Sequence, residues 1–178
     1  MFFPTAKKGF LNEGAKAFTL IELLVVIFII SFFSAFVVFN KGKSQATLSL
    51  ERTSFQIAQN IRRTEELAIA AQFFNGSYPA GGYGIRFEKS ANSYVIFADV
   101  NQDGNYSEGE LVENIVLDNL VTITDLLPNS PAVAIFKAPD PSVVLPGGAE
   151  SISIKISATG IDLEKTISVN SLGVIEIQ

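Results

Sequence analysis

Hydrophobic residues are distributed unevenly along this chain of 178 residues. An apolar run extends from Phe18 to Phe39 and contains a single charged side chain, Glu22. The run has 22 residues, and a helix of that length measures about 33 Å, which matches a bilayer core of about 30 Å. The pattern therefore predicts a membrane-spanning helix over residues 18–39.

Polar residues return after this run, but residue types that favour helices continue to about residue 75. Apolar side chains recur there at helical spacing and form a single stripe. We therefore predict that residues 40–75 continue as an amphipathic helix, which ends at Asn75-Gly76 and packs its stripe against a sheet. The stripe consists of Leu48, Phe55, Ala58, Ile61, Leu67, Ala68 and Ala71.

Short alternating segments separated by Gly, Pro and Asn turns characterise residues 76–178. Strands of this length and spacing favour antiparallel pairing with one solvent-exposed face. The predicted fold class is therefore α+β, with a long N-terminal helix, half in the membrane and half amphipathic, packed on an antiparallel β-sheet head. The predicted strands are Tyr83–Phe87, Tyr94–Ala98, Leu111–Leu117, Val121–Asp125, Val133–Phe136, Ser151–Ala158, Lys165–Val169 and Val174–Ile177, with 128–148 the least structured stretch.

Composition excludes several kinds of chemistry. The chain has no Cys and no His, which excludes disulfides, a Cys/His zinc site and a His-based catalytic triad. The net charge of −5 argues against a nucleic-acid surface. Arg62 and Arg63 are interpreted as a solvated helix face that pairs with Glu65 and Glu66, and the less favoured alternative is a nucleic-acid contact.

Residues 1–17 carry a net positive charge and precede the apolar run. A basic segment in this position is typical of an export signal. The apolar run is longer than the core of a conventional cleaved signal peptide, which makes that alternative the less favoured one.

The segment from Lys16 to Ile27, Lys-Ala-Phe-Thr-Leu-Ile-Glu-Leu-Leu-Val-Val-Ile, resembles the cleavage and assembly motif of type IV prepilins and type II secretion pseudopilins. The resemblance implies that a prepilin peptidase cuts on the cytoplasmic side between Ala17 and Phe18, then N-methylates Phe18. The family usually has Gly where this chain has Ala17. The leader 1–17 would be removed and the apolar helix retained.

Glu22 is the residue that the apolar run must accommodate. A charged side chain at the centre of a membrane helix costs about 2.5–3.5 kcal/mol on insertion scales. After cleavage, Phe18 would carry a free ammonium group about one helical turn away. We predict that Glu22 pairs with such an ammonium during filament assembly and marks the register between chains. The alternative is that Glu22 lies near the interface and extends to water.

Residues 99–110 fit the calcium-loop pattern D-x-[DN]-x-[DN]-G-x5-E. The flanking segments are predicted strands rather than EF-hand helices, so the loop would lie within a β-hairpin. The alternative is a solvated acidic turn without metal. The carboxylates of Asp103, Glu108 and Glu110 could mimic a glycosidase pair, but they crowd one turn, which argues against an enzyme. The candidate calcium ligands are the side chains of Asp99, Asn101, Asp103 and Glu110 and the carbonyl of Asn105.

The segments at residues 83–87, 94–99 and 166–177 resemble the GspH/FimT type of minor pseudopilin. This resemblance implies a tip-proximal subunit of a type IV pilus or type II secretion pseudopilus. The implied location is the inner membrane, single-pass, with the head outside the cytoplasm, and later the filament. The implied partners are other pilin subunits, the prepilin peptidase, the inner-membrane assembly platform and the membrane. A DNA- or ligand-binding minor pilin of a competence or adhesion filament, and a major pseudopilin, remain open alternatives.

Overall fold

The computed structural model describes residues 18–138 and 143–178, so the leader 1–17 and the cleavage position Ala17 lie outside the described residues. The chain divides into two units, Met1–Asn40 and Lys41–Gln178, and each is described by itself. The elements are α1 (Leu20–Ile69), β1 (Gly82–Phe87), β2 (Ser93–Asp99), β3 (Leu111–Val116), β4 (Val121–Leu127), β5 (Ala132–Phe136), β6 (Val143–Val144), the 3-10 helix η1 (Pro146–Gly148), β7 (Ser151–Ala158), β8 (Glu164–Asn170) and β9 (Ile175–Ile177).

The last turn of α1 ends at Ile69, earlier than the predicted end near residue 75. Ala71 adopts a left-handed conformation with φ of 46°. The Gln72 N–H donates to the Leu67 carbonyl at 3.1 Å, and the Ala71 N–H donates to the Ala68 carbonyl at 3.0 Å. This pair of bonds is a Schellman motif, which satisfies the last carbonyls and stops the helix.

Asn75 and Gly76 form a turn of their own instead of ending the helix. Their φ angles are 50° and 89°, and Phe74 and Ser77 exchange backbone hydrogen bonds across the turn at 2.8 and 3.2 Å. Two successive positive φ angles favour Asn-Gly at the tip of a tight hairpin. Asn75-Gly76 therefore forms a turn, as its residue types indicate, but the turn is the tip of this hairpin and not the end of the helix.

The described strands of the head form two antiparallel sheets, where the sequence predicted only a sheet of short strands. One has the order β3-β2-β1-β5-β6 and the other β4-β7-β8-β9. The predicted strand Ser151–Ala158 matches β7 at both ends, and the other seven differ from the observed strands by one or two residues at one or both ends. Strand β6 lies in the stretch predicted to be least structured and pairs with β5 through Ile135 and Phe136.

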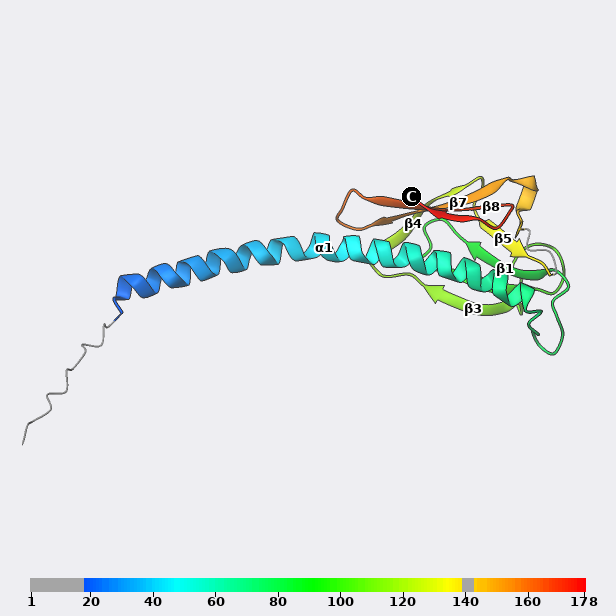
Figure 1. Cartoon of the computed structure of the whole chain (residues 1–178), viewed down its shortest axis with the longest axis horizontal. Coiled ribbons are helices and arrows are strands. Elements are labelled where there is room, and N and C mark those ends of the chain that lie inside the picture. The colour runs from blue at the N-terminus through cyan, green and yellow to red at the C-terminus, as the bar shows by residue number, and fades with distance from the viewer. Residues whose placement is uncertain (1–17, 139–142) are drawn as a thin grey trace, which may run out of the picture. The chain divides into compact units, whose positions relative to one another are not determined.

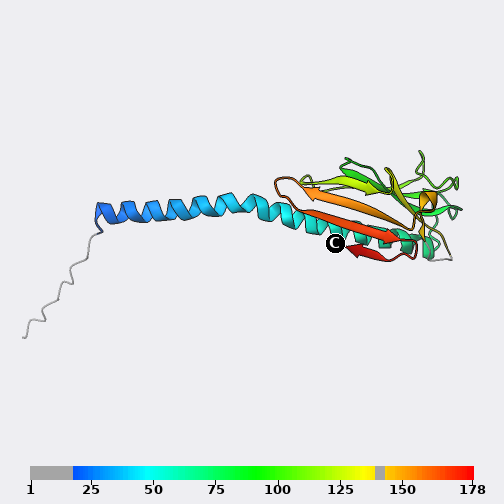
Figure 2. The ribbon, with the colours of Figure 1, turned by 90° about the horizontal axis from the view of Figure 1, so that it is seen from above.

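Within the unit of residues 41–178, α1 and both sheets share one hydrophobic core. Figures 1 and 2 show this part of α1, in cyan to green, running alongside the strands. Every second residue of β7 is buried, so Ile152, Ile154 and Ile156 face inward. The helix contributes Ala46, Leu50, Ile57, Ile61 and Ala68 to the same core. The predicted α+β fold, with a long helix packed on antiparallel sheets, is therefore confirmed.

A second, smaller cluster lies on the opposite face of the sheet that contains β1, β2 and β5. It consists of Phe97, Val133 and Ile135, with Tyr106 packed against them. The rings of Phe97 and Tyr106 meet edge to face at 5.8 Å. Because Tyr106 belongs to the loop between β2 and β3, that loop folds back over the sheet and shields this face.

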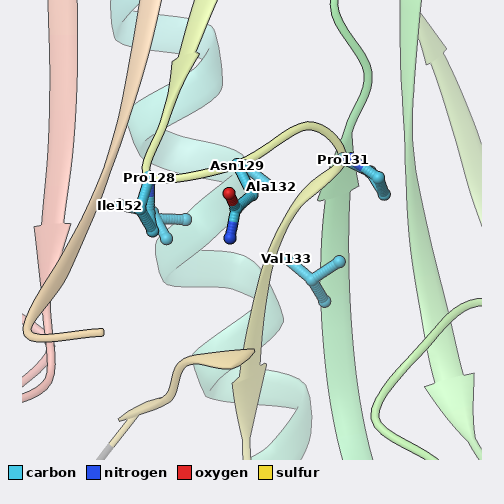
Figure 3. A pocket seen from close by; sticks show the side chains of 6 residues that line it. All are labelled: Pro128, Asn129, Pro131, Ala132, Val133 and Ile152. Atoms are coloured by element: carbon cyan, nitrogen blue, oxygen red, sulfur yellow. The ribbon is translucent and has the colours of Figure 1, made fainter. Parts of the chain in front are cut away.

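The turn between β4 and β5 borders a small cavity of about 20 Å³. Figure 3 shows Pro128 beside Ile152 of β7, and Asn129 in the turn that leads from β4 to β5. A volume of this size holds about one water molecule, which is too little for an organic ligand.

Candidate functional site

Glu22 lies in the first turn of α1, and Thr19 immediately precedes the helix. The Glu22 N–H donates to Thr19 Oγ1 at 3.3 Å, and the Leu23 N–H donates to the Thr19 carbonyl at 3.2 Å. This is the bonding expected when Thr caps a helix N-terminus, and Thr-x-x-Glu is the sequence of a capping box. Glu22 thus has a local role, favourable beside the positive end of the helix dipole, in addition to any role between chains.

The surface around Glu22 is apolar and unburied. All residues from 18 to 37 are exposed, and the side chain of Phe18 is 80% exposed. Among the residues that the structure describes, α1 is the one helix long and apolar enough to cross a membrane. Exposed apolar surface of this extent requires lipid or other apolar helices as its surroundings.

The loop from residue 99 to residue 110 begins and ends with a buried carboxylate. Asp99 is 2% exposed and Glu110 is 5% exposed. Asp99 Oδ2 accepts a hydrogen bond from the Gly104 N–H at 3.2 Å, whereas Asp99 Oδ1 is buried and, within the described part of the chain, has no partner. Burial raises the pKa of Asp99 above its usual value, because an unpaired charge is poorly solvated there.

The side-chain carboxylate of Glu110 closes the loop by accepting hydrogen bonds from backbone N–H groups of the loop. One carboxylate oxygen, Oε1, accepts hydrogen bonds from the N–H groups of Val100 at 3.0 Å and Asn101 at 3.3 Å. The other, Oε2, accepts from the Ser107 N–H at 2.8 Å. Carboxylates that accept several backbone bonds stabilise a turn without a metal, so Glu110 has a structural role in this loop whether or not a cation binds.

The other candidate ligands lie at the surface of the loop. Asn101 Oδ1 accepts from the Asp103 N–H at 3.0 Å, and Asp103 Oδ1 accepts from the Asn105 N–H at 2.7 Å. Over residues 18–138 and 143–178, no three Asp or Glu side chains converge as a metal site would require. Calcium binding therefore stays a prediction. Asp99 and Asp103 do share one cavity of about 240 Å³, lined also by Gly81, Gln102, Gly104, Ile135, Lys137 and Val144.

Arg63 does not pair along the helix as the sequence predicted. Its guanidinium reaches Glu113 of β3 at 2.6 Å, and both side chains are about half exposed. No ion pair of Arg62 with Glu65 or Glu66 is present in the described part of the chain; the three side chains line a surface hollow beside Val174 and Ile175. The ion pair of Arg63 is therefore formed with Glu113 of the neighbouring strand β3, and not with a residue of the adjacent helical turn.

Thr19 is the functional residue that reasoning on the sequence missed. Its signal was present, because Ser or Thr three residues before Glu, ahead of an apolar run, predicts a helix start. The backbone bonds of Glu110 had no comparable signal, since they depend on how the loop folds back.

Comparison with protein families identifies a prokaryotic N-terminal methylation motif at residues 14–38. This motif is that of prepilin-type proteins, the class of type IV pilins and pseudopilins. It implies processing by a prepilin peptidase and assembly with other pilin subunits, and it points to a structural subunit rather than to an enzyme. Neither the curated proteins nor the solved structures contain a match to the chain.

Proposed function

We propose that this chain is a minor, tip-proximal subunit of a type IV pilus or type II secretion pseudopilus. The methylation motif at residues 14–38 is the observation that carries the proposal. The leader 1–17 is removed after Ala17, and Phe18 becomes the methylated N-terminus. The chain is then held in the inner membrane by residues 18–39, with its head outside the cytoplasm, until it enters the filament through the assembly platform.

The exposed apolar surface of residues 18–37 supports assembly through this segment. In a filament these side chains exchange lipid for the same segment of neighbouring chains. Glu22 then sits in an apolar interior, where an unpaired carboxylate is costly. The ammonium group of Phe18 on an adjacent chain is its partner, so only one register between chains is favourable.

The test separates this pairing from helix capping by Thr19. Glu22→Leu should leave membrane insertion intact and reduce incorporation into sheared filaments by at least about tenfold, since losing a charge-assisted bond of about 1.5–3 kcal/mol corresponds to that factor. Thr19→Ala is the matched control, because it removes the cap bond of 3.3 Å and keeps the carboxylate. Normal incorporation of Glu22→Leu would exclude the pairing, and equal loss in both variants would assign the defect to capping.

Calcium binding by residues 99–110 is a second candidate function. The unpartnered, buried Asp99 Oδ1 favours it, because a buried charge is stable only when it is paired or coordinates a metal. Asp99, Asn101, Asp103 and Glu110 supply side-chain oxygens, and Asn105 supplies its carbonyl.

Titration calorimetry of residues 44–178 with calcium chloride tests this site. Heat of binding is expected from the unmodified head and its loss from Asp103→Ala. Glu108→Ala is the control, because Glu108 lies in the same exposed turn but outside the ligand pattern. If the unmodified fragment of residues 44–178 gives no heat of binding, the loop does not bind calcium.

A further inference from the structure

The loop that carries the candidate calcium ligands contains a second motif, which the proposed function does not use. Asn105-Tyr106-Ser107 matches the acceptor pattern N-x-[ST] for N-glycosylation. We propose that Asn105 is an N-glycosylation site, modified by a membrane oligosaccharyltransferase with a polyprenyl-diphosphate-linked oligosaccharide as donor. The proposal rests on the proposed function, because the head must reach the outer side of the membrane.

Asn105 is placed where an enzyme can reach it. The residue is exposed and belongs to no strand. Its side-chain Nδ2 donates a local hydrogen bond to the Asp103 carbonyl at 3.1 Å. Loops that stand outside the sheet ladders are the usual places for such modification.

Two further groups lie beside Asn105: the hydroxyl of Ser107, the third residue of the motif, and the carboxylate of Asp103, which precedes the motif. Ser107 Oγ takes part only in a long hydrogen bond of 3.4 Å from Asn101 Nδ2, within the described part of the chain. Asp103, two residues before the acceptor, is exposed and accepts the Asn105 N–H through Oδ1. Among the residues that the structure describes, its second oxygen, Oδ2, accepts a hydrogen bond only from Asn101 Nδ2, at 2.9 Å. A negative charge at this position can pair with a cationic group of the transferase.

The sequence holds one other Asn-x-Ser/Thr segment, Asn75-Gly76-Ser77, and the structure distinguishes the two. Asn75 lies in the tight hairpin closed by the Phe74–Ser77 bonds of 2.8 and 3.2 Å. The residue two positions before it is Phe73, which offers no charge. Asn75 is therefore an internal control that has the tripeptide but lacks the preceding acid.

The reaction is a balanced group transfer. Asn105 Nδ2 forms a bond to C1 of the first sugar, and the bond between C1 and the diphosphate oxygen breaks. The polyprenyl diphosphate leaves with the bonding electron pair, and one proton of the amide passes to a base of the transferase. No oxidant or reductant takes part.

The test uses the full chain, coexpressed in bacterial cells with an oligosaccharyltransferase and a polyprenyl-diphosphate-linked oligosaccharide of known mass. Peptide mass spectrometry should find one glycan on Asn105 and none on Asn75. Asn105→Gln and Ser107→Ala should abolish the modification, whereas Ser107→Thr and Asn75→Gln should retain it. Asp103→Asn should lower occupancy about tenfold, as expected for a lost charge-assisted contact.

A second copy of Asp-Gly-Asn-Tyr-Ser, appended after Gln178 through a Gly-Ser linker, reports on export of the head. If this appended copy is modified and Asn105 is not, the inference is overturned while the proposed membrane orientation stands. If neither is modified, the head has not crossed the membrane, and the inference fails together with that orientation.

Discussion

Tyr94 and Asn60 form a polar contact at the edge of the core. Asn60 Nδ2 donates to the Tyr94 hydroxyl at 2.7 Å, and the Tyr94 ring packs against Phe87 at 5.0 Å. The residue is 2% exposed. Burial raises the pKa of Tyr94 to about 12, with a smaller contribution in the same direction from Glu113 and an opposing one from the Asn60 hydrogen bond.

This pKa predicts how the head responds to alkali. Between pH 10 and pH 12, the unfolded chain loses the Tyr94 proton while the folded chain retains it, so stability falls as pH rises, by about 1.4 kcal/mol per pH unit from this group. In the Tyr94→Phe variant, this part of the decrease in unfolding free energy with pH should be absent. At neutral pH its free energy of unfolding should be lower by about 1 kcal/mol, because the hydrogen bond from Asn60 is lost. Urea unfolding of both proteins from pH 8 to pH 11.5 measures the difference; identical slopes would contradict the prediction.

At the scale of elements, the end of α1 shows how one backbone angle limits a helix. Helix-forming residue types continue beyond Ile69, but Ala71 adopts φ of 46° and its Schellman bonds stop the helix. Left-handed geometry is costly for a residue with a Cβ atom and is free for Gly.

Ala71→Gly should therefore stabilise the head by about 0.5–1 kcal/mol. Ala70→Gly is the matched control. It is equally exposed, but its N–H still donates to the Glu66 carbonyl at 2.8 Å in helical fashion, so this change should destabilise by about 0.5–1 kcal/mol. Urea unfolding of the three proteins gives the comparison, and a loss of stability in Ala71→Gly would contradict the assignment.

At the scale of the whole molecule, the shared core makes the head depend on α1. Ile57 of the helix and Ile154 of β7 are both fully buried in one cluster. Elements that share a core unfold together in a small domain. The polar half of α1 is therefore a structural part of the head.

Ile57→Ala and Ile154→Ala should each lower the free energy of unfolding of residues 44–178 by about 2–5 kcal/mol, within a single transition. Leu172→Ala is the control, because Leu172 is 77% exposed and should change stability by less than about 0.5 kcal/mol. Separate transitions for the helix and the sheets, followed by circular dichroism and near-ultraviolet absorbance, would contradict a single core.

The sequence by itself determined the features that depend on local order along the chain. The apolar run around Glu22, the helix after it and strands such as Ser151–Ala158 follow from hydrophobic periodicity, which any fold must respect. The methylation motif is likewise a property of consecutive residues. The motif at residues 14–38 supports a subunit of the type IV pilin and pseudopilin class without reference to tertiary structure.

Only the tertiary structure decided which distant residues meet. It divided the strands between two sheets, paired β6 with β5, and gave Arg63 the partner Glu113. It also folded the loop of residues 99–110 over Phe97, which buried Asp99 and turned Glu110 toward three backbone N–H groups. Such contacts depend on long-range packing, and the spacing of ligand-type residues alone does not encode whether a carboxylate faces a cation or a backbone amide.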